Sequence, residues 1–268
     1  MRLVICQKNY SIQWDGTYYF ALETYPKIQD WELEKIAAFS AYETMNCRRT
    51  EIISQNDMVL KEITDYLQNH TVTPPFKPSC KKVASTYDVS GKAVFCDWLS
   101  HTCTVDTARD ILISERLLSA VKAFDLSAEE LMKDPRNAAG DPADYFDYVM
   151  LGWSNTSSGY RLAMERLLGH LPNDKELDDF FVPGVSFHFH YDEVTSLDHY
   201  LFDGYHPAKL RGELSLKHLK ACIIPKEQAP LFDSIIPEIL KTRCFYLPYK
   251  NEGLIRWNEK VYRFLQNI

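Results

Sequence analysis

The stretch PGVSFHFHYDEV, residues 183–194, carries the clearest fold signal in this chain. Apolar and polar side chains alternate along it, which is the period-two pattern of a half-buried strand. One side carries Val185, Phe187, Phe189 and Tyr191, and the other carries Ser186, His188, His190 and Asp192. The polar side could be a metal site, the wall of a substrate pocket or solvated surface, and the rest of the sequence must decide among them.

Composition limits the class of protein. The chain has 268 residues, of which 46% are hydrophobic and 13% aromatic, so it can bury a core as one large domain or two smaller ones. The net charge of -7 and the absence of a block of Lys and Arg disfavour non-specific nucleic-acid binding, which depends on neutralising phosphates.

The sequence also predicts the compartment. No apolar run approaches the roughly 20 residues of a spanning helix, and the N-terminus lacks the pattern of a signal peptide. Seven cysteines are scattered without a C-x-x-C pair, which indicates reduced thiols rather than a disulfide framework. We therefore expect a cytoplasmic protein without a membrane segment.

Residues 1–80 read as a small α/β unit. RLVIC and TYYFALE are short apolar strands with the turn signal Asp15–Gly16 between them, and Asp30 and Asn56 are positioned to cap two helices. The proline-rich segment HTVTPPFKPSCKK, residues 70–82, predicts a boundary near residue 80. It could equally be a long loop inside one domain.

Residues 81–268 predict an α+β fold, because strands and helices alternate irregularly. The expected strands cover residues 92–102, 145–153, 185–192, 219–225 and 243–249. Thr104 or Asp106 is expected to cap a helix, Ser127 and Glu130 form a capping box, and the chain closes with an amphipathic helix over residues 253–268.

Common nucleotide and nucleophile motifs are missing. The sequence contains no G-x-S-x-G elbow, no Walker loop and no G-x-G-x-x-G, and only 10 glycines occur in all. A nucleotide, if bound, must therefore be held by side chains and ordinary strands rather than by a glycine-rich loop.

Three segments share an order with a known family. They are DWLSHTCTVDTARDILISERLLSA (97–120), DYVMLGWSNTSSGYR (147–161) and GELSLKHLKACIIPKEQ (212–228). Over about residues 93–228 the chain resembles the ADP-ribosyltransferase superfamily, closest to the branch of DNA-targeting toxins and RNA 2′-phosphotransferases. The resemblance implies a split β-sheet core with flanking helices. SNTSSG stands where that branch has Arg-Ser after the central strand.

The resemblance implies roles for particular residues. Glu213 would bind the 2′-hydroxyl of the nicotinamide ribose and stabilise the oxocarbenium ion, which is sound carboxylate chemistry. The remaining cofactor-binding residues would be His101, Thr102, Tyr148, Trp153, Ser154, Asn155, Tyr160 and Arg161. Some of these residues also have a structural interpretation: Glu213 as a surface carboxylate, His101 as a capping histidine, Tyr148 and Trp153 as core aromatics, and Arg161 as a helix-surface cation.

The function implied is an NAD-dependent mono-ADP-ribosyltransferase that modifies a macromolecule, in a toxin or phage-defence setting. The acidic balance slightly favours a protein acceptor over nucleic acid. Under this interpretation His188 and His190 line the NAD or acceptor pocket without a metal. The alternatives are a non-catalytic immunity or partner-binding protein, such as an antitoxin, and a metal-dependent enzyme that uses His188 and His190.

Overall fold

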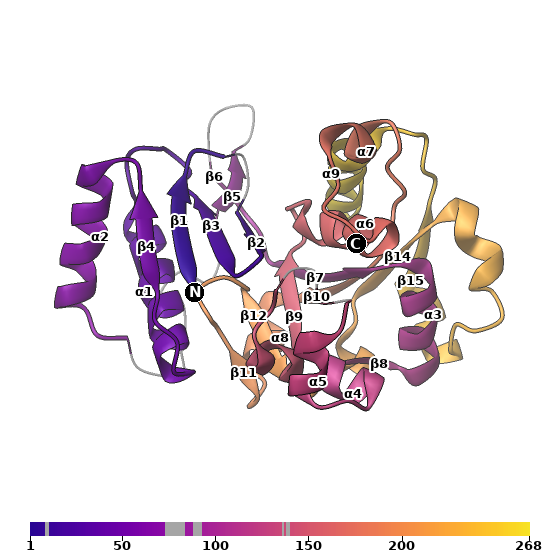
Figure 1. Cartoon of the computed structure of the whole chain (residues 1–268). Coiled ribbons are helices and arrows are strands. Elements are labelled where there is room, and N and C mark those ends of the chain that lie inside the picture. The colour runs from indigo at the N-terminus through magenta and orange to yellow at the C-terminus, as the bar shows by residue number, and fades with distance from the viewer. Residues whose placement is uncertain (9–10, 73–83, 88–92, 136, 138–139) are drawn as a thin grey trace.

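The chain is an α+β protein with two main sheets, seen side by side in Figure 1. The computed structural model describes residues 1–8, 11–72, 84–87, 93–135, 137 and 140–268. The proline-rich connector predicted around residue 80 lies mostly outside the described residues.

The first sheet has four strands in the order β2-β3-β1-β4. They are β1 (Arg2–Cys6), β2 (Ile12–Trp14), β3 (Thr17–Ala21) and β4 (Glu51–Ser54). β1 runs parallel to β3 and β4, whereas β2 and β3 form an antiparallel hairpin. The predicted turn at Asp15 and Gly16 therefore joins β2 to β3, and a short strand intervenes between the two strands that the sequence predicts.

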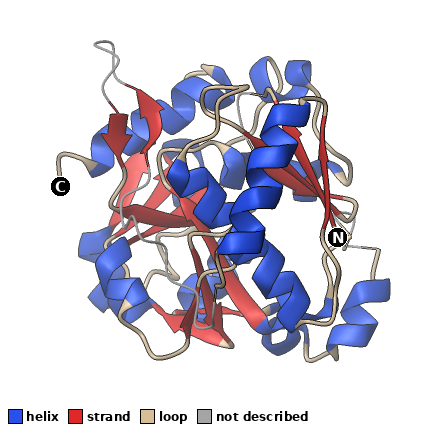
Figure 2. Cartoon of the chain, turned by 90° about the vertical axis from the view of Figure 1, so that its left-hand side faces the viewer, coloured by secondary structure: helices blue, strands red, loops and turns tan. Residues whose placement is uncertain are grey.

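Two helices cover this sheet, α1 (Asp30–Met45) and α2 (Asp57–Asn69) (Figure 2, seen from the side that carries α2). The predicted cap at Asn56 is confirmed, since its side chain accepts hydrogen bonds from the first turn of α2. The predicted cap at Asp30 is wrong. Gln29 takes that position because it forms a capping box with Glu32, and Asp30 lies in the first turn.

The second sheet has seven strands in the order β11-β12-β9-β7-β10-β14-β15. They are β7 (Trp98–Cys103), β9 (Tyr148–Trp153), β10 (Val185–His190), β11 (Tyr200–Leu201), β12 (Ala208–Arg211), β14 (Ala221–Pro225) and β15 (Cys244–Leu247). Neighbours are antiparallel except β14 and β15. Two small pairs accompany it: β8 (Arg116–Leu118) with β13 (Glu213–Ser215), and β5 (Ala84–Tyr87) with β6 (Ala93–Phe95).

The seven strands are joined weakly at one place. β7 pairs with β10 over the whole of β10, but with β9 only at Leu99↔Trp153 and Ser100↔Gly152. Beyond these pairs no further β7–β9 partners occur, and the Nδ1 of His101 lies 3.4 Å from the carbonyl oxygen of Met150. The sheet is therefore continuous, rather than two separate sheets, but a three-stranded and a four-stranded part meet at only two register pairs.

Helices cover both faces of this sheet (Figure 1). One face packs against α6 (Ser158–Leu168), α7 (Asp174–Asp178) and α9 (Gly253–Leu265). The other packs against α3 (Val105–Ser114) and α8 (Tyr191–Thr195). Helices α4 (Ala120–Phe124) and α5 (Ala128–Lys133) contact the 3-10 turn η1 (Ala143–Asp147). Three more 3-10 turns lie elsewhere in the second part: η2 (Leu216–His218), η3 (Lys226–Leu231) and η4 (Glu238–Arg243). Burial of both faces places Ser186 and His188, on the polar side of β10, in the interior.

Several predicted boundaries can now be compared with the structure. The caps at Thr104 and Ser127 and the closing amphipathic helix are confirmed. The strand predicted from residue 145 begins only at Tyr148, because Tyr145 belongs to the 3-10 turn that follows Pro142. The strand predicted through Asp192 ends at His190, where α8 begins.

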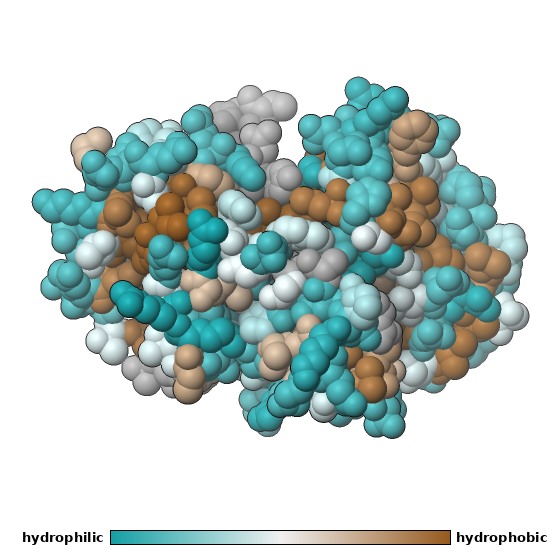
Figure 3. Space-filling view, in the orientation of Figure 1, coloured by the Kyte–Doolittle hydropathy of each residue, from teal (hydrophilic) through white to brown (hydrophobic). Residues whose placement is uncertain are grey.

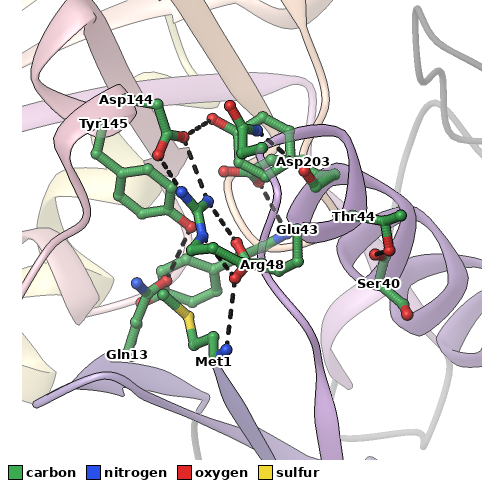
Figure 4. Close-up of polar contacts among 12 residues, drawn as sticks. Met1, Gln13, Ser40, Glu43, Thr44, Arg48, Asp144, Tyr145 and Asp203 are labelled. Carbon is green, nitrogen blue, oxygen red and sulfur yellow. Dashed lines mark hydrogen bonds and ion pairs between the residues drawn. The ribbon is translucent and has the colours of Figure 1, made fainter.

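Charged and aromatic side chains join the two parts of the chain (Figure 4). Tyr42 on α1 donates its hydroxyl hydrogen to Asp144, and Arg48 pairs with both Glu43 and Asp144. Behind them lies the fully buried Lys209, whose Nζ is 2.8 Å from the Tyr42 hydroxyl and 3.3 Å from the Asp203 carboxylate. We call Tyr42, Arg48, Asp144, Asp203 and Lys209 the junction cluster.

Candidate functional site

The ends of three central strands, β7, β9 and β10, meet at one end of the second sheet. His190 at the end of β10 is the register partner of Trp98 at the start of β7, and Trp153 at the end of β9 pairs with the next residue of β7. Main-chain bonds fix the exits, since Ser154 donates to the Trp98 carbonyl and Tyr191 to that of Asp97. Segments far apart in the sequence are thus held together by the sheet itself.

A hollow of about 330 Å³ opens at these strand ends. It is lined by Asp97, His190, Tyr191, Asp192 and Glu193. Two aromatic pairs lie against it: the rings of Trp98 and His190 are 4.3 Å apart, and those of Trp153 and Tyr191 stack at 5.1 Å. Flat aromatic surfaces beside carboxylates suit a planar ring that bears hydroxyl or amide groups.

A chain of four hydrogen-bonded side chains lies behind the hollow. The Tyr160 hydroxyl is 2.8 Å from Ser186 Oγ, which is 2.8 Å from Nε2 of His188. The other ring nitrogen of His188 is 2.9 Å from Ser154 Oγ. Burial lowers the pKa of His188 to about 3, so the ring is neutral, and one nitrogen donates while the other accepts.

The polar face of β10 therefore has two different parts. His188 is only 1% exposed and belongs to the interior, so it does not line a pocket as the sequence suggests. The reason is that α6 lies over this face and brings Tyr160 onto Ser186. His190 is exposed and does line the hollow, with its ring tilted against that of Trp98.

Helix α6 begins next to these groups. The turn SNTSSG leads into it, and Ser157 at its N-cap position makes no side-chain capping bond. A Cβ on Gly159 would lie 2.7 Å from Thr102 Oγ1, so a glycine is required for α6 to start this close to β7. The first-turn N–H groups of a helix have no partner within it, and they favour negative charge.

Asn155 adds a second polar feature at this helix start. Its side chain is 8% exposed, yet neither its amide nitrogen nor its amide oxygen has a hydrogen-bond partner among the described residues. Leaving such a group unpaired costs about 1–3 kcal/mol. Arg161 contributes a cation in the first turn of α6. The Asn155 amide and the first-turn N–H groups form a polar, positively polarised place that an anionic ligand would satisfy.

The structure brings some of the predicted cofactor residues together. Trp153, Ser154, Asn155 and Tyr160 lie around the β9 end and the start of α6, and Thr102 contacts the same helix through Gly159. The first four positions come from one stretch of sequence, so their proximity follows from the strand-turn-helix that it forms.

Other predicted residues lie elsewhere. His101 is in the widening gap between β7 and β9, where its Nδ1–H donates to the Met150 carbonyl oxygen. Burial lowers the pKa of its imidazole. Tyr148 begins β9, roughly 16 Å from Trp153 at about 3.3 Å per residue. Its ring faces the ammonium of Lys209 at 4.7 Å, in the junction cluster.

Glu213 lies beyond that same far end. It follows Gly212, whose N–H bonds to Asp147, and it begins β13. Its side chain is 40% exposed and paired with Lys122 at 2.9 Å and Arg116 at 3.4 Å. These cations, chiefly the Lys122 hydrogen bond, lower the pKa of Glu213. The residues that line the hollow do not include it.

A metal site at His188 and His190 has little structural support. Both ring nitrogens of His188 are engaged by serine hydroxyls. Within the described ranges, no group of three or more His, Cys, Asp or Glu side chains is arranged to hold a metal ion.

The sequence reasoning missed part of this site. Asp97, Trp98 and Tyr191 lie at the hollow, although only the family resemblance drew attention to the segment that begins with Asp97. The sequence signal for this site is a polar residue at a strand end, such as Asp97 just before β7 and His190 at the end of β10. The junction cluster was missed entirely, because nothing in the local pattern around Lys209 distinguishes it from a surface lysine.

Comparison with known proteins found no matching family model, no matching curated protein and no matching solved structure. In the described part of the chain, no helix combines the length and hydropathy that crossing a bilayer requires. Functional inference for this chain therefore rests on the geometry of the site.

Proposed function

We propose that the chain is an NAD-dependent ADP-ribosyltransferase. It binds NAD where α6 begins, beside the ends of β7, β9 and β10, and it modifies a macromolecular acceptor, with protein favoured over nucleic acid. The observation that carries the proposal is the unpaired, buried Asn155 just before the uncapped start of α6. The hollow at the neighbouring ends of β7 and β10 adds three carboxylates. The weak seam between β9 and β7 supports the split-sheet fold that goes with this activity.

The pyrophosphate of NAD would bind at the start of α6. The first-turn N–H groups and the Asn155 amide are neutral donors, and Arg161 supplies the charge. No glycine-rich loop is needed, since Gly159 alone lets the helix start approach β7 closely. This arrangement agrees with a sequence that lacks the usual phosphate-binding motifs.

The hollow would take one ring of the cofactor. Its volume of about 330 Å³ lies at the lower end of ligand pockets, so it suits one half of a dinucleotide rather than the whole. Stacking beside Trp153 and Tyr191 would orient that ring.

The reaction needs a carboxylate near the nicotinamide ribose. Cleavage of the glycosidic bond leaves its electron pair on nicotinamide and positive charge on the ribose, which a carboxylate stabilises until the acceptor nucleophile bonds to the anomeric carbon and loses its proton. Asp97 and Asp192 lie at the hollow, and we assign this role to that pair. Glu213, which the resemblance implies, is the competing candidate.

Labelled NAD tests the assignment. Wild type should release nicotinamide, and Asp97→Asn or Asp192→Asn should lower the rate by about 100-fold or more, as loss of one transition-state electrostatic contact does. Glu213→Gln is the matched control and should retain most activity. A silent wild type contradicts the enzyme; loss of activity only in Glu213→Gln contradicts the assignment to the hollow.

A partner-binding function is the second candidate. Exposed apolar side chains at the end of α6 and between α6 and β10 support it, namely Leu167, Leu171, Phe180 and Val182. Figure 3 also shows hydrophobic residues gathered over the first sheet and near the right-hand edge. If wild type neither binds NAD nor releases nicotinamide, and Phe180→Asp abolishes a complex that wild type forms in cells, this function replaces the enzymatic one.

The location proposed is the cytoplasm. Six cysteines of the described residues carry free thiols, while Cys80 lies outside those residues. Free thiols are typical of a reducing compartment.

A further inference from the structure

Two cysteines lie opposite each other on neighbouring strands. Cys222 on β14 and Cys244 on β15 are register partners in the one parallel ladder of the second sheet. Partners in a ladder project to the same face, and both side chains border the same hydrophobic core. Cys222 is fully buried, whereas Cys244 is partly exposed.

This arrangement suits a disulfide bond. Neighbouring strands of a sheet lie about 4.7–4.9 Å apart, and disulfides join Cα atoms about 4.4–6.8 Å apart. The two thiols also lie close enough to shift each other's pKa. Formation of the bond therefore requires rotation of two side chains rather than movement of a strand.

We propose that Cys222 and Cys244 are a redox-active pair that a peroxide converts to a disulfide and a thiol reductant restores. The inference is independent of the proposed function. It concerns the edge of the sheet formed by β14 and β15, away from the residues assigned to NAD.

The two cysteines have different roles. Cys244 is the more exposed, and the hydrogen bond from Cys222 lowers its pKa, while burial raises the pKa of Cys222. The Cys244 thiolate attacks one peroxide oxygen, the O–O bond breaks, and a sulfenic acid and hydroxide form. The hydroxide takes up the proton that the Cys244 thiol lost and becomes water. The Cys222 sulfur then displaces the hydroxyl as a second water, forms the S–S bond and gives up its proton. Two electrons pass from the thiols to the peroxide.

The other described cysteines lack such a partner position. Cys103 shares this core, but it lies on β7, with β10 between it and β14, and its thiol faces the Val185 carbonyl at 3.9 Å. Cys96 belongs to the core on the opposite face. Cys6 and Cys47 lie in the first part of the chain, Cys6 on β1 and Cys47 exposed after α1.

The bond would tie down an edge strand. β15 is the last strand of the sheet and leads into α9. Trp257 of α9 is fully buried and packs edge-on against Tyr160, with ring centroids 6.4 Å apart. Oxidation at Cys244 would therefore restrain the element that holds α9 against α6.

The experiment uses the full chain with Cys47→Ser, which removes an exposed thiol that could cross-link two molecules. After brief exposure to hydrogen peroxide, the unfolded protein should show two fewer free thiols than its reduced control. Peptide mapping without reductant should find the 222–244 cross-link, and dithiothreitol should remove it. Cys103→Ser is the matched control and should keep the cross-link.

Cys222→Ser separates the two roles. It should leave Cys244 trapped as a sulfenic acid that dimedone labels, whereas Cys244→Ser should give no label at Cys222. The proposal is overturned if the Cys47→Ser protein shows no 222–244 bond at a peroxide dose that fully oxidises Cys47 of the wild-type chain. It is also overturned if the cross-link joins Cys103 instead.

Discussion

Two buried polar clusters of this molecule differ in the charge of their side chains. The chain Tyr160–Ser186–His188–Ser154 contains hydroxyls and a neutral imidazole, and it lies inside one part of the structure. The junction cluster contains full charges and lies where the first part meets the second. The neutral chain satisfies its own hydrogen bonds, whereas the charged cluster needs residues from both parts at once.

The difference appears in the electrostatics. Burial alone lowers the pKa of His188, which has no charged partner. Burial also opposes ionisation of Asp203, yet His206 and Lys209 outweigh it and hold the pKa of that carboxyl well below its usual range. Lys209 is further held over the ring of Tyr145 at 3.7 Å. Removing one member should therefore cost far more at the junction than in the neutral chain.

The largest effect is expected from Lys209→Met. It leaves the buried Asp203 without its lysine, so the free energy of unfolding should fall by about 3–5 kcal/mol. Lys220→Met removes a partly exposed lysine that pairs with Glu193 at 2.7 Å, and should cost about 1 kcal/mol or less. Urea unfolding measures both, and equal losses would contradict the contrast between buried and exposed pairs.

A pair of glycines tests the junction by contact rather than charge. Gly204 and Gly169 both have positive φ, so alanine at either should cost about 1–2 kcal/mol in backbone strain. A Cβ at Gly204 would also lie 2.3 Å from the Lys35 carbonyl of α1, and at Gly169 it meets nothing within 4 Å. Gly204→Ala should therefore lose about 1–3 kcal/mol more.

Thermal unfolding of the two variants compares them directly. Limited proteolysis should cut Gly204→Ala faster than wild type between the first and second parts, because the substitution pushes α1 away from the loop before β12. Identical stability of the two alanine variants would show that the parts do not meet as closely as described.

The neutral chain should make the free energy of unfolding depend on pH. The pKa of His188 is about 3 in the folded protein and near 6.5 when unfolded, so only the unfolded state takes up this proton between those values. Stability from this group is present above pH 6.5 and is lost as the pH falls toward 3, by up to about 1.4 kcal/mol per pH unit.

His188→Gln should be less stable than wild type at pH 7 and should show a shallower decline between pH 6 and 4. His170→Gln, which changes an exposed histidine, is the control and should keep the wild-type slope. An unchanged slope in His188→Gln would mean that the imidazole is not sealed in the interior.

The smallest effect is expected at Glu213. Its pairs with Lys122 and Arg116 are exposed, so Glu213→Gln should change the free energy of unfolding by less than about 1 kcal/mol. A loss near that of Lys209→Met would contradict the assignment of Glu213 to the surface.

Local signals predicted the elements well. Caps at Asn56, Thr104 and Ser127 depend on one side chain and nearby N–H groups, so the sequence contains all the information. The alternation in residues 185–190 predicted β10 and its two faces for the same reason. It could not predict that α6 covers the polar face, because that depends on packing between distant segments.

The candidate site was predicted only in part. Trp153, Ser154, Asn155 and Tyr160 were found because one continuous segment brings them together. Asp97 and Asp192 come from other strand ends, and only the pairing of β7 with β9 and β10 places them at the hollow. The family resemblance implied Glu213 from order along the chain, which contains no information about the opposite ends of β9.

Calorimetric titration with NAD tests the central claim most directly, because binding does not depend on the acceptor. Wild type should bind, Asn155→Ala should bind about tenfold more weakly, equivalent to about 1.4 kcal/mol, and Glu213→Gln should match wild type. Unchanged affinity in Asn155→Ala, together with a loss in Glu213→Gln, would contradict the placement of NAD at the start of α6.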